Sequence, residues 1–174
     1  PALASKSGAD LLLKVKGNKF LERLKGKTIG VLMGGLSSER GISLLTGNAV
    51  LEAIRKKGLN ALAIEVDHQI AERLNAKKID LAFIALHGTY GEDGAIQGVL
   101  EYLKIPYTGS GTLGSALAFN KAICKAIFKA NNIPTADYKL MRYEKNQRID
   151  IPLPLPLVVK PSNQGSSFGI TIVS

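Results

Sequence analysis

Two lysines and a loop of small polar residues in the last third of the chain could hold the phosphates of a nucleotide. Lys160 follows a short apolar run, and after Pro161 come residues 162–167, which are all small or polar. The backbone N–H groups of such a loop can close around an anion, and the hydroxyls of Ser166 and Ser167 add donors for phosphate oxygens. Lys121 stands 39 positions before Lys160 and could approach the same phosphates. These residues predict a nucleoside triphosphate that is held for chemistry on a carboxylate.

Two further candidate residues lie at points where strands are predicted to end. Glu39 follows the double glycine of Gly34 and Gly35, and His87 opens a glycine-rich loop after another apolar run. Ligands of open α/β sheets gather at the carboxyl ends of the strands, where a helix N-terminus also favours an anion. From the residues alone, Glu39 could also be an acid that only complements the helix dipole. His87 could equally be a structural histidine.

The elements that must position these residues alternate between strand and helix from residue 28 onward. Apolar runs predict strands over 29–33, 61–66 and 81–86, and intervening periodic segments predict helices ending near 57, 77 and 103. Ser37 or Ser38 is the expected cap of the first helix, Gly58 its expected stop, and Asp93 the expected cap of the third. This alternation predicts an α/β fold whose parallel sheet is covered on both faces.

The pattern changes after about Gly111. The sequence predicts one long helix over 115–130, a strand over 136–142, and paired strands over 157–160 and 170–173 on either side of the glycine-serine loop. We therefore expect an N-terminal α/β domain over 28–111 and a second domain over 112–174. A hairpin with a helix is too small for a whole nucleotide-binding domain. The second domain is therefore expected to be partial, with its remainder beyond Ser174.

Composition argues against several classes of protein. No apolar run is long enough to cross a bilayer, and the first residues carry no signal-peptide pattern. Cys124 is the only cysteine, which excludes a disulfide within the chain and a cysteine-rich metal site. We therefore expect a cytoplasmic protein that does not contact a membrane.

The net charge of +9 is unevenly distributed along the chain. Residues 1–27 carry seven Lys or Arg and only two acids, so this basic leader accounts for more than half of the excess. Aromatic side chains that could stack on bases are few. We therefore expect no nucleic-acid partner, and we interpret the leader as a solvated helix or flexible tail.

Taken in order, these segments resemble the D-alanine–D-alanine ligases, a family of the ATP-grasp superfamily. The resemblance covers about residues 28–174 and leaves the leader outside. It is carried by residues 34–40, 42–44, 85–88, 91–94, 96–98, 105–111, 115–116, 120–121, 158–161 and 165–167. It implies that 28–111 form a Rossmann-like, pre-ATP-grasp domain and that 112–174 begin an α+β ATP-grasp domain.

The resemblance also implies a reaction for peptidoglycan synthesis. ATP phosphorylates the carboxylate of a first D-alanine, and the amine of a second D-alanine then attacks the acyl phosphate. The implied catalytic residues are Glu39, which would hold the first ammonium group, and Ser166, which would help to position the second D-alanine. His87 would lie near the reacting carboxylate. The implied contacts to the ATP phosphates are Lys121, Lys160, Gly165 and Ser167.

Further properties follow only from the resemblance. Mg²⁺ would assist, with ligands beyond Ser174 and none within this chain, and the enzyme would be a homodimer. The chain departs from the family at Gly41, where an acid is usual, and at Asn120, where Asp is usual. We expect no ligase activity from these 174 residues alone. A D-alanine–D-lactate or D-alanine–D-serine ligase, another ATP-grasp carboxylate-amine ligase, and a non-catalytic binding module remain alternatives.

Overall fold

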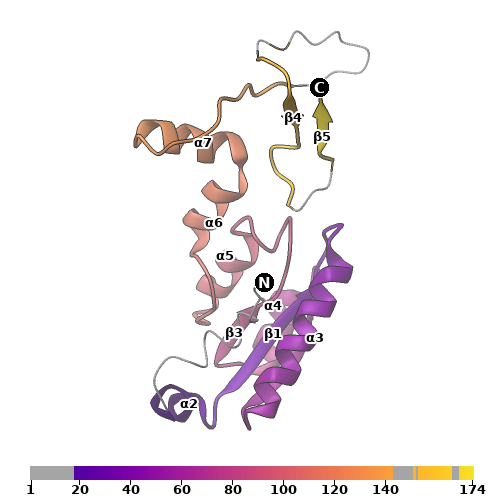
Figure 1. Ribbon diagram of the computed structural model, residues 1–174. Coiled ribbons are helices and arrows are strands. Elements are labelled where there is room, and N and C mark those ends of the chain that lie inside the picture. The colour runs from indigo at the N-terminus through magenta and orange to yellow at the C-terminus, as the bar shows by residue number, and fades with distance from the viewer. Residues whose placement is uncertain (1–17, 143–150, 152, 166–168) are drawn as a thin grey trace, which may run out of the picture.

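The computed structural model describes residues 18–142, 151, 153–165 and 169–174 (Figure 1). Its larger sheet has three parallel strands in the order β2-β1-β3. The strands are β1 (Thr28–Gly34), β2 (Asn60–Val66) and β3 (Leu81–Ile84). The helices around this sheet are α2 (Asn18–Leu24), α3 (Arg40–Lys56), α4 (Ile70–Lys77) and α5 (Ala95–Tyr102). The parallel α/β architecture predicted from the alternating pattern is confirmed.

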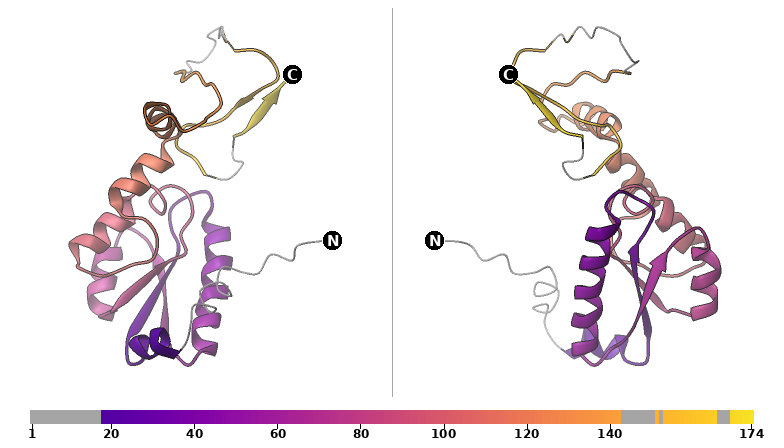
Figure 2. Two further views of the ribbon diagram at one scale, coloured as in Figure 1. Left: turned by 60° about the vertical axis from the view of Figure 1, so that its left-hand side comes forward. Right: turned by 90° about the vertical axis from the view of Figure 1, so that its right-hand side faces the viewer.

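Helices cover both faces of the sheet, and each face has its own apolar cluster (Figure 2). On one face Leu32 and Ile64 pack with Leu74 of α4 and Leu100 of α5. On the other face the strands pack against α3, where a Cβ on Gly47 would lie 2.5 Å from the Cβ of Met33. α3 therefore packs closely against β1. This packing places the N-terminal end of α3 beside the carboxyl end of the strand.

Several predicted boundaries in this part of the chain shift. β3 ends at Ile84 and not at residue 86, although the amide of Ala85 still donates to the carbonyl of Leu32. The cap predicted at Ser37 or Ser38 is wrong: Glu39 occupies the N-cap of α3 and makes no side-chain capping bond. Gly58 has φ of +74° directly after the helix, which confirms it as the stop.

The single long helix predicted over 115–130 is wrong, because the chain forms α6 (Thr112–Phe119) and α7 (Lys121–Ala130). Asn120 between them has extended backbone angles, with φ of −81° and ψ of 103°. Its side chain accepts the N–H groups of Ala122 and Ile123 at 3.1 and 3.0 Å. Because this cap satisfies the first amides of a new helix, the chain can change direction there. Lys121 therefore stands at the first position of α7 and not in the middle of a helix.

The strand predicted over 136–142 is also wrong. The described residues of that segment form no strand, and the carbonyl of Ala136 accepts a hydrogen bond from Lys125 of α7 at 2.6 Å. The segment is thus tied to a helix by a side chain and pairs with no neighbouring strand.

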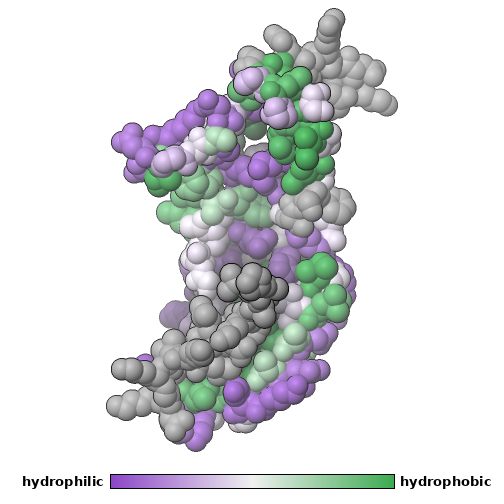
Figure 3. Space-filling model, in the orientation of Figure 1, coloured by the Kyte–Doolittle hydropathy of each residue, from purple (hydrophilic) through white to green (hydrophobic). Residues whose placement is uncertain are grey.

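A second sheet is formed by β4 (Leu157–Val159) and β5 (Thr171–Val173), which pair antiparallel as predicted. Apolar side chains gather over this hairpin, whereas polar side chains cover much of α7 (Figure 3). Val158 and Ile172 are more than half exposed. The division into domains over 28–111 and 112–174 stays a prediction.

Of the basic leader, the structure describes only its last residues, which include α2. Leu24 at the end of α2 packs against the apolar cluster on the α3 face of the sheet. Within the part of the chain that the structure describes, no helix has both the length and the apolar character needed to span a bilayer.

Candidate active site

The carboxylate of Glu39 lies where three segments of the chain meet. Its Oε2 atom is 2.5 Å from the position that a Cβ on Gly88 would take, and 2.8 Å from the corresponding position on Gly165. Gly88 belongs to the loop after β3, and Gly165 belongs to the loop between β4 and β5, which points toward the first sheet (Figure 1). Neither glycine could carry a side chain without displacing this carboxylate. The structure therefore brings Glu39 together with the loop of His87 and with the glycine-serine loop.

His87 is fixed through its backbone and its ring. The hydroxyl of Ser37 donates to the carbonyl of His87 at 2.7 Å, and Thr46 Oγ1 lies 3.3 Å from the ring atom Nε2. The next amide, that of Gly88, donates to Glu92 Oε2 at 2.8 Å. Glu92 Oε2 is also 3.4 Å from the position of a Cβ on Gly165, so this carboxylate borders the same space as Glu39.

Ser43 joins the carboxyl ends of β1 and β3 from the buried face of α3. Its hydroxyl accepts the amide of Gly34 at 2.9 Å and donates to the carbonyl of Ala85 at 2.8 Å, and the residue is fully buried. The sequence analysis did not predict that Ser43 links these two strand ends. The available signal was a serine one helical turn after Glu39, on a face that must pack against an apolar strand.

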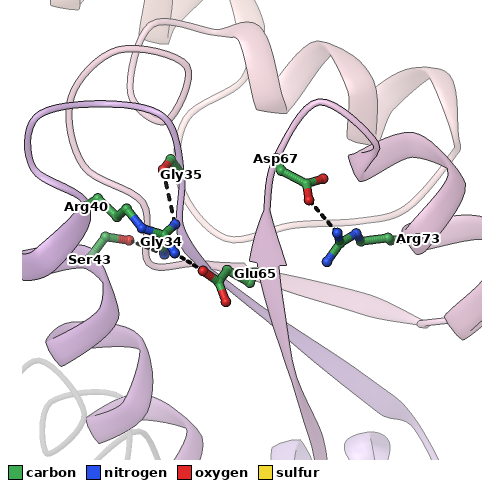
Figure 4. A network of polar contacts seen from close by, with 7 residues as sticks. All are labelled: Gly34, Gly35, Arg40, Ser43, Glu65, Asp67 and Arg73. Carbon is green, nitrogen blue, oxygen red and sulfur yellow. Dashed lines mark hydrogen bonds and ion pairs between the residues drawn. The ribbon is translucent and has the colours of Figure 1, made fainter.

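The turn after β1 contains two glycines with positive φ and is flanked by polar contacts of Arg40. Gly34 and Gly35 have φ of +80° and +83°, a region that other residues rarely adopt. Arg40 donates to the carbonyl of Gly35 at 3.3 Å and pairs with Glu65 at the end of β2 (Figure 4). These contacts hold the loop that leads into Glu39.

A second pair beside this network involves Asp67 and Arg73 (Figure 4). It ties the loop after β2 to α4. The pair therefore links the residue that follows β2 to the helix that comes next in the chain.

Lys121 is bound to the glycine-serine loop. Its Nζ donates to the carbonyl of Gln164, and its amide donates to the carbonyl of Ser162 at 3.1 Å. The pKa of Lys121 lies below its usual range, first because burial disfavours the ammonium form and second because the positive charge of Lys160 repels it. Lys121 therefore contacts the glycine-serine loop, and the charge of Lys160 acts on its ammonium group.

Replacing Lys160 by methionine is expected to raise the pKa of Lys121, because the repelling charge is removed while much of the side-chain volume stays. A lysine whose pKa is lower in the folded than in the unfolded state binds a proton on unfolding. The free energy of unfolding therefore rises with pH between the folded pKa of Lys121 and its unfolded value, and this rise should shrink in K160M. Titration of ¹³C-labelled lysine side chains by NMR measures the change. The matched control is K129M, which removes a lysine that pairs with Asp137 at 3.2 Å. An unchanged Lys121 titration in K160M would contradict the expected proximity.

A pocket of about 220 Å³ lies beside the His87 loop, at the carboxyl ends of the parallel strands. Its lining is mostly apolar and includes Leu36, Val66, Leu86, Tyr90 and Ile96, together with His68 and His87. Within the described part of the chain, neither Glu39 nor Lys121 lines it. The pocket therefore adjoins the Glu39 cluster through the His87 loop and through Gly35 and Leu36 of the loop that leads into Glu39.

Asp93 does not occupy the N-cap predicted for it, which belongs to Gly94 with φ of +94°. Its carboxylate instead accepts the amides of Tyr90 and Ala95 at 2.9 and 3.1 Å, so it braces the His87 loop against α5.

The predicted residues Ser166 and Ser167 lie outside the described residues. Among the residues that the structure describes, no group of three or more His, Cys, Asp or Glu side chains could hold a metal ion.

Two family models match the chain. The model of the "D-ala D-ala ligase N-terminus" matches residues 65–110, and that of the "D-ala D-ala ligase C-terminus" matches residues 127–174. Among curated relatives, the D-alanine–D-alanine ligase of Geotalea uraniireducens is 54% identical over 154 residues, which are 88% of this chain and 50% of the relative. That of Trichlorobacter lovleyi is 52% identical over 87% of this chain and 49% of its own length.

Solved structures of D-alanine–D-alanine ligases also match the chain. The crystal structure of D-alanine–D-alanine ligase from Bacillus anthracis superposes with a TM-score of 0.72 at 41% identity, over 84% of this chain and 49% of that one. The same enzyme complexed with ATP gives a TM-score of 0.70 at 39% identity, over 84% and 50%. The chain thus spans about half the length of the relatives it matches. The motif order, the parallel sheet and these matches lead to one conclusion: the chain belongs to the D-alanine–D-alanine ligase family.

Proposed function

We propose that this chain provides the first D-alanine site and part of the ATP site of an ATP-dependent D-alanine–D-alanine ligase. The observation that carries the proposal is the meeting of Glu39 with Gly88 and Gly165, because it joins the substrate edge of the parallel sheet to the phosphate-binding loop. The proposed setting is peptidoglycan synthesis in the cytoplasm.

In this proposal, Glu39 binds the ammonium group of the first D-alanine through a charge-assisted hydrogen bond. The adjoining His87 then lies beside the carboxylate of the same molecule. That carboxylate must meet the γ-phosphate of ATP in line, so catalysis depends mainly on positioning and on neutralising charge.

Lys121 and Lys160 are proposed to bind the phosphate oxygens of ATP, with Gly165 and Ser167 of the same loop. The fit is supported by the contacts of Lys121 with that loop and by its electrostatic coupling to Lys160. Two ammonium groups in one region repel each other, and an anion between them removes that cost.

The proposed reaction has two steps. The γ-phosphoryl group passes from ATP to a carboxylate oxygen of the first D-alanine, which releases ADP and leaves an acyl phosphate. The amine of the second D-alanine attacks the acyl carbon, loses a proton, and expels inorganic phosphate. Ser166 is proposed to help orient the second D-alanine.

Mg²⁺, when bound, would neutralise charge on the phosphate oxygens during transfer. The described residues around Lys121 and Lys160 offer cations and not a group of acids, so they fit the phosphates and not the metal. We therefore assign no metal ligand among the described residues. A homodimer is the proposed assembly, and sedimentation velocity tests it.

The test is ADP release by the protein that carries this chain, measured in the presence of D-alanine, ATP and Mg²⁺. We expect ADP release that depends on D-alanine and not on L-alanine, with D-alanyl-D-alanine as the product in mass spectrometry. Absence of D-alanine-dependent ADP release would overturn the proposal. A higher kcat/KM with D-lactate or D-serine as the second substrate would replace it with the corresponding alternative ligase.

A further inference from the structure

The ring of His87 has one hydrogen-bond partner among the described residues, the hydroxyl of Thr46 at 3.3 Å from Nε2. Thr46 lies on α3, seven residues and thus two turns after Glu39, so both side chains arise from one side of the helix. α3 and its N-cap residue therefore approach the His87–Gly88 segment at two points. Glu39 lies beside Gly88, and Thr46 lies beside the ring of His87.

The backbone of this segment is fixed independently of Thr46. The carbonyl of His87 accepts the hydroxyl of Ser37, the amide of Gly88 donates to Glu92, and Gly88 has φ of +71°. What these contacts leave undetermined is the rotation of the imidazole and the nitrogen that carries its proton. Both are set by whatever pairs with the ring.

We propose that Thr46 is a positioning residue that donates to His87 Nε2 and so keeps the proton of the neutral ring on Nδ1. The Thr46 hydroxyl has no other hydrogen-bond acceptor in the described part of the chain, so its proton is available to the ring. A hydroxyl that donates to Nε2 excludes the tautomer with a proton on that atom.

The consequence concerns the substrate and rests on the proposed function. With Nε2 occupied by Thr46, Nδ1 is the remaining ring nitrogen that can meet a D-alanine carboxylate. In the Nδ1–H tautomer this atom is a donor, which a carboxylate oxygen requires. In the other tautomer it would present a lone pair to an anion and repel it. Thr46 thus makes an uncharged histidine suitable for binding a carboxylate.

The first test reads the tautomer itself and needs no enzyme activity. In a chain whose histidines carry ¹⁵N, the chemical shifts of the ring nitrogens distinguish the two tautomers under alkaline conditions, where imidazole is neutral. His68 is the second of the two histidines in the chain and serves as an internal control.

We expect the Nδ1–H tautomer at His87 in the unmodified chain and in T46S, and a shift toward Nε2–H in T46V. His68 should stay unchanged in all three. T171V, an exposed threonine-to-valine change on β5, is the matched control and should leave His87 unchanged. If T46V fails to fold, the tautomer of His87 in the unmodified chain still tests the proposal. A proton on Nε2 of that ring would overturn it. An identical tautomer in folded T46V overturns it as well.

The second test uses the ligase assay of the protein that carries this chain. T46V should raise the KM for the first D-alanine by about tenfold, since one hydrogen bond to a charged group is lost, while the KM for ATP stays the same. T46S should restore the KM. A protein without any ligase activity would contradict the proposed function and leave the tautomer result standing. An active protein whose KM for D-alanine is the same in T46V would contradict the role of Thr46.

Discussion

Replacing Gly88 by alanine is expected to lower the free energy of unfolding by about 1–2 kcal/mol, because alanine must adopt a left-handed backbone conformation at this position. The backbone has φ of +71°, which a residue with a Cβ rarely adopts. The new methyl group would also stand 2.5 Å from Glu39 Oε2 and 3.2 Å from Ser37 Oγ. Either the carboxylate moves or the loop after β3 moves, and the two cannot keep their present geometry.

The same change should reduce D-alanine-dependent turnover, since a shift of about 1 Å in a positioning group costs about a hundredfold in rate. Chemical denaturation measures the stability, and ADP release measures the turnover. G41A is the matched control, because a Cβ there would meet nothing within 4 Å and the residue lies within α3. Alanine in a helix should stabilise the chain by about 0.5–1 kcal/mol relative to glycine. Equal stability of G88A and the unmodified chain would show that the His87 loop does not depend on this glycine.

Removing the hydroxyl of Ser43 is expected to destabilise the fold by about 2–4 kcal/mol, because S43A leaves two buried backbone groups without their partner. The amide of Gly34 loses its acceptor and the carbonyl of Ala85 loses its donor. Both groups lie at the carboxyl ends of strands from which the candidate site is built. The loops that carry Glu39 and His87 should therefore move apart more readily in the variant.

Two measurements separate this brace from a general loss of packing. Denaturation should show the loss in S43A and little change in S38A, a serine-to-alanine change at an exposed position of the preceding loop. Hydrogen exchange should accelerate at the amide of Gly34 more than at the amides in the middle of β1. If exchange at Gly34 stays slow in S43A, the hydroxyl of Ser43 is not what protects that amide.

The N-terminal α/β fold could be predicted because its local signals agree with one another. Apolar runs of strand length alternate with amphipathic segments, and Gly58 ends a helix where the periodicity ends. Glu39 and His87 could be placed at one edge for the same reason, since parallel strands bring their carboxyl ends together.

The wrong predictions concern segments whose local sequence is compatible with two different structures. Residues 115–130 have a helical composition throughout, but Asn120 can either continue a helix or cap a new one. Residues 136–142 have strand character, but a strand requires a partner, and Lys125 of α7 binds that segment instead. Neither choice is encoded within the segment itself.

The sequence by itself determined which segments are strands in the N-terminal α/β part of the chain, which family motifs occur, and in what order they follow. Only the tertiary structure decided that Glu39 meets both Gly88 and Gly165, that Thr46 reaches the ring of His87, and that Ser43 joins two strand ends. The physical reason is the range of the interactions. Periodicity and turn chemistry act over a few neighbouring residues, whereas these contacts join residues far apart in the chain and depend on how closely α3 packs against the sheet.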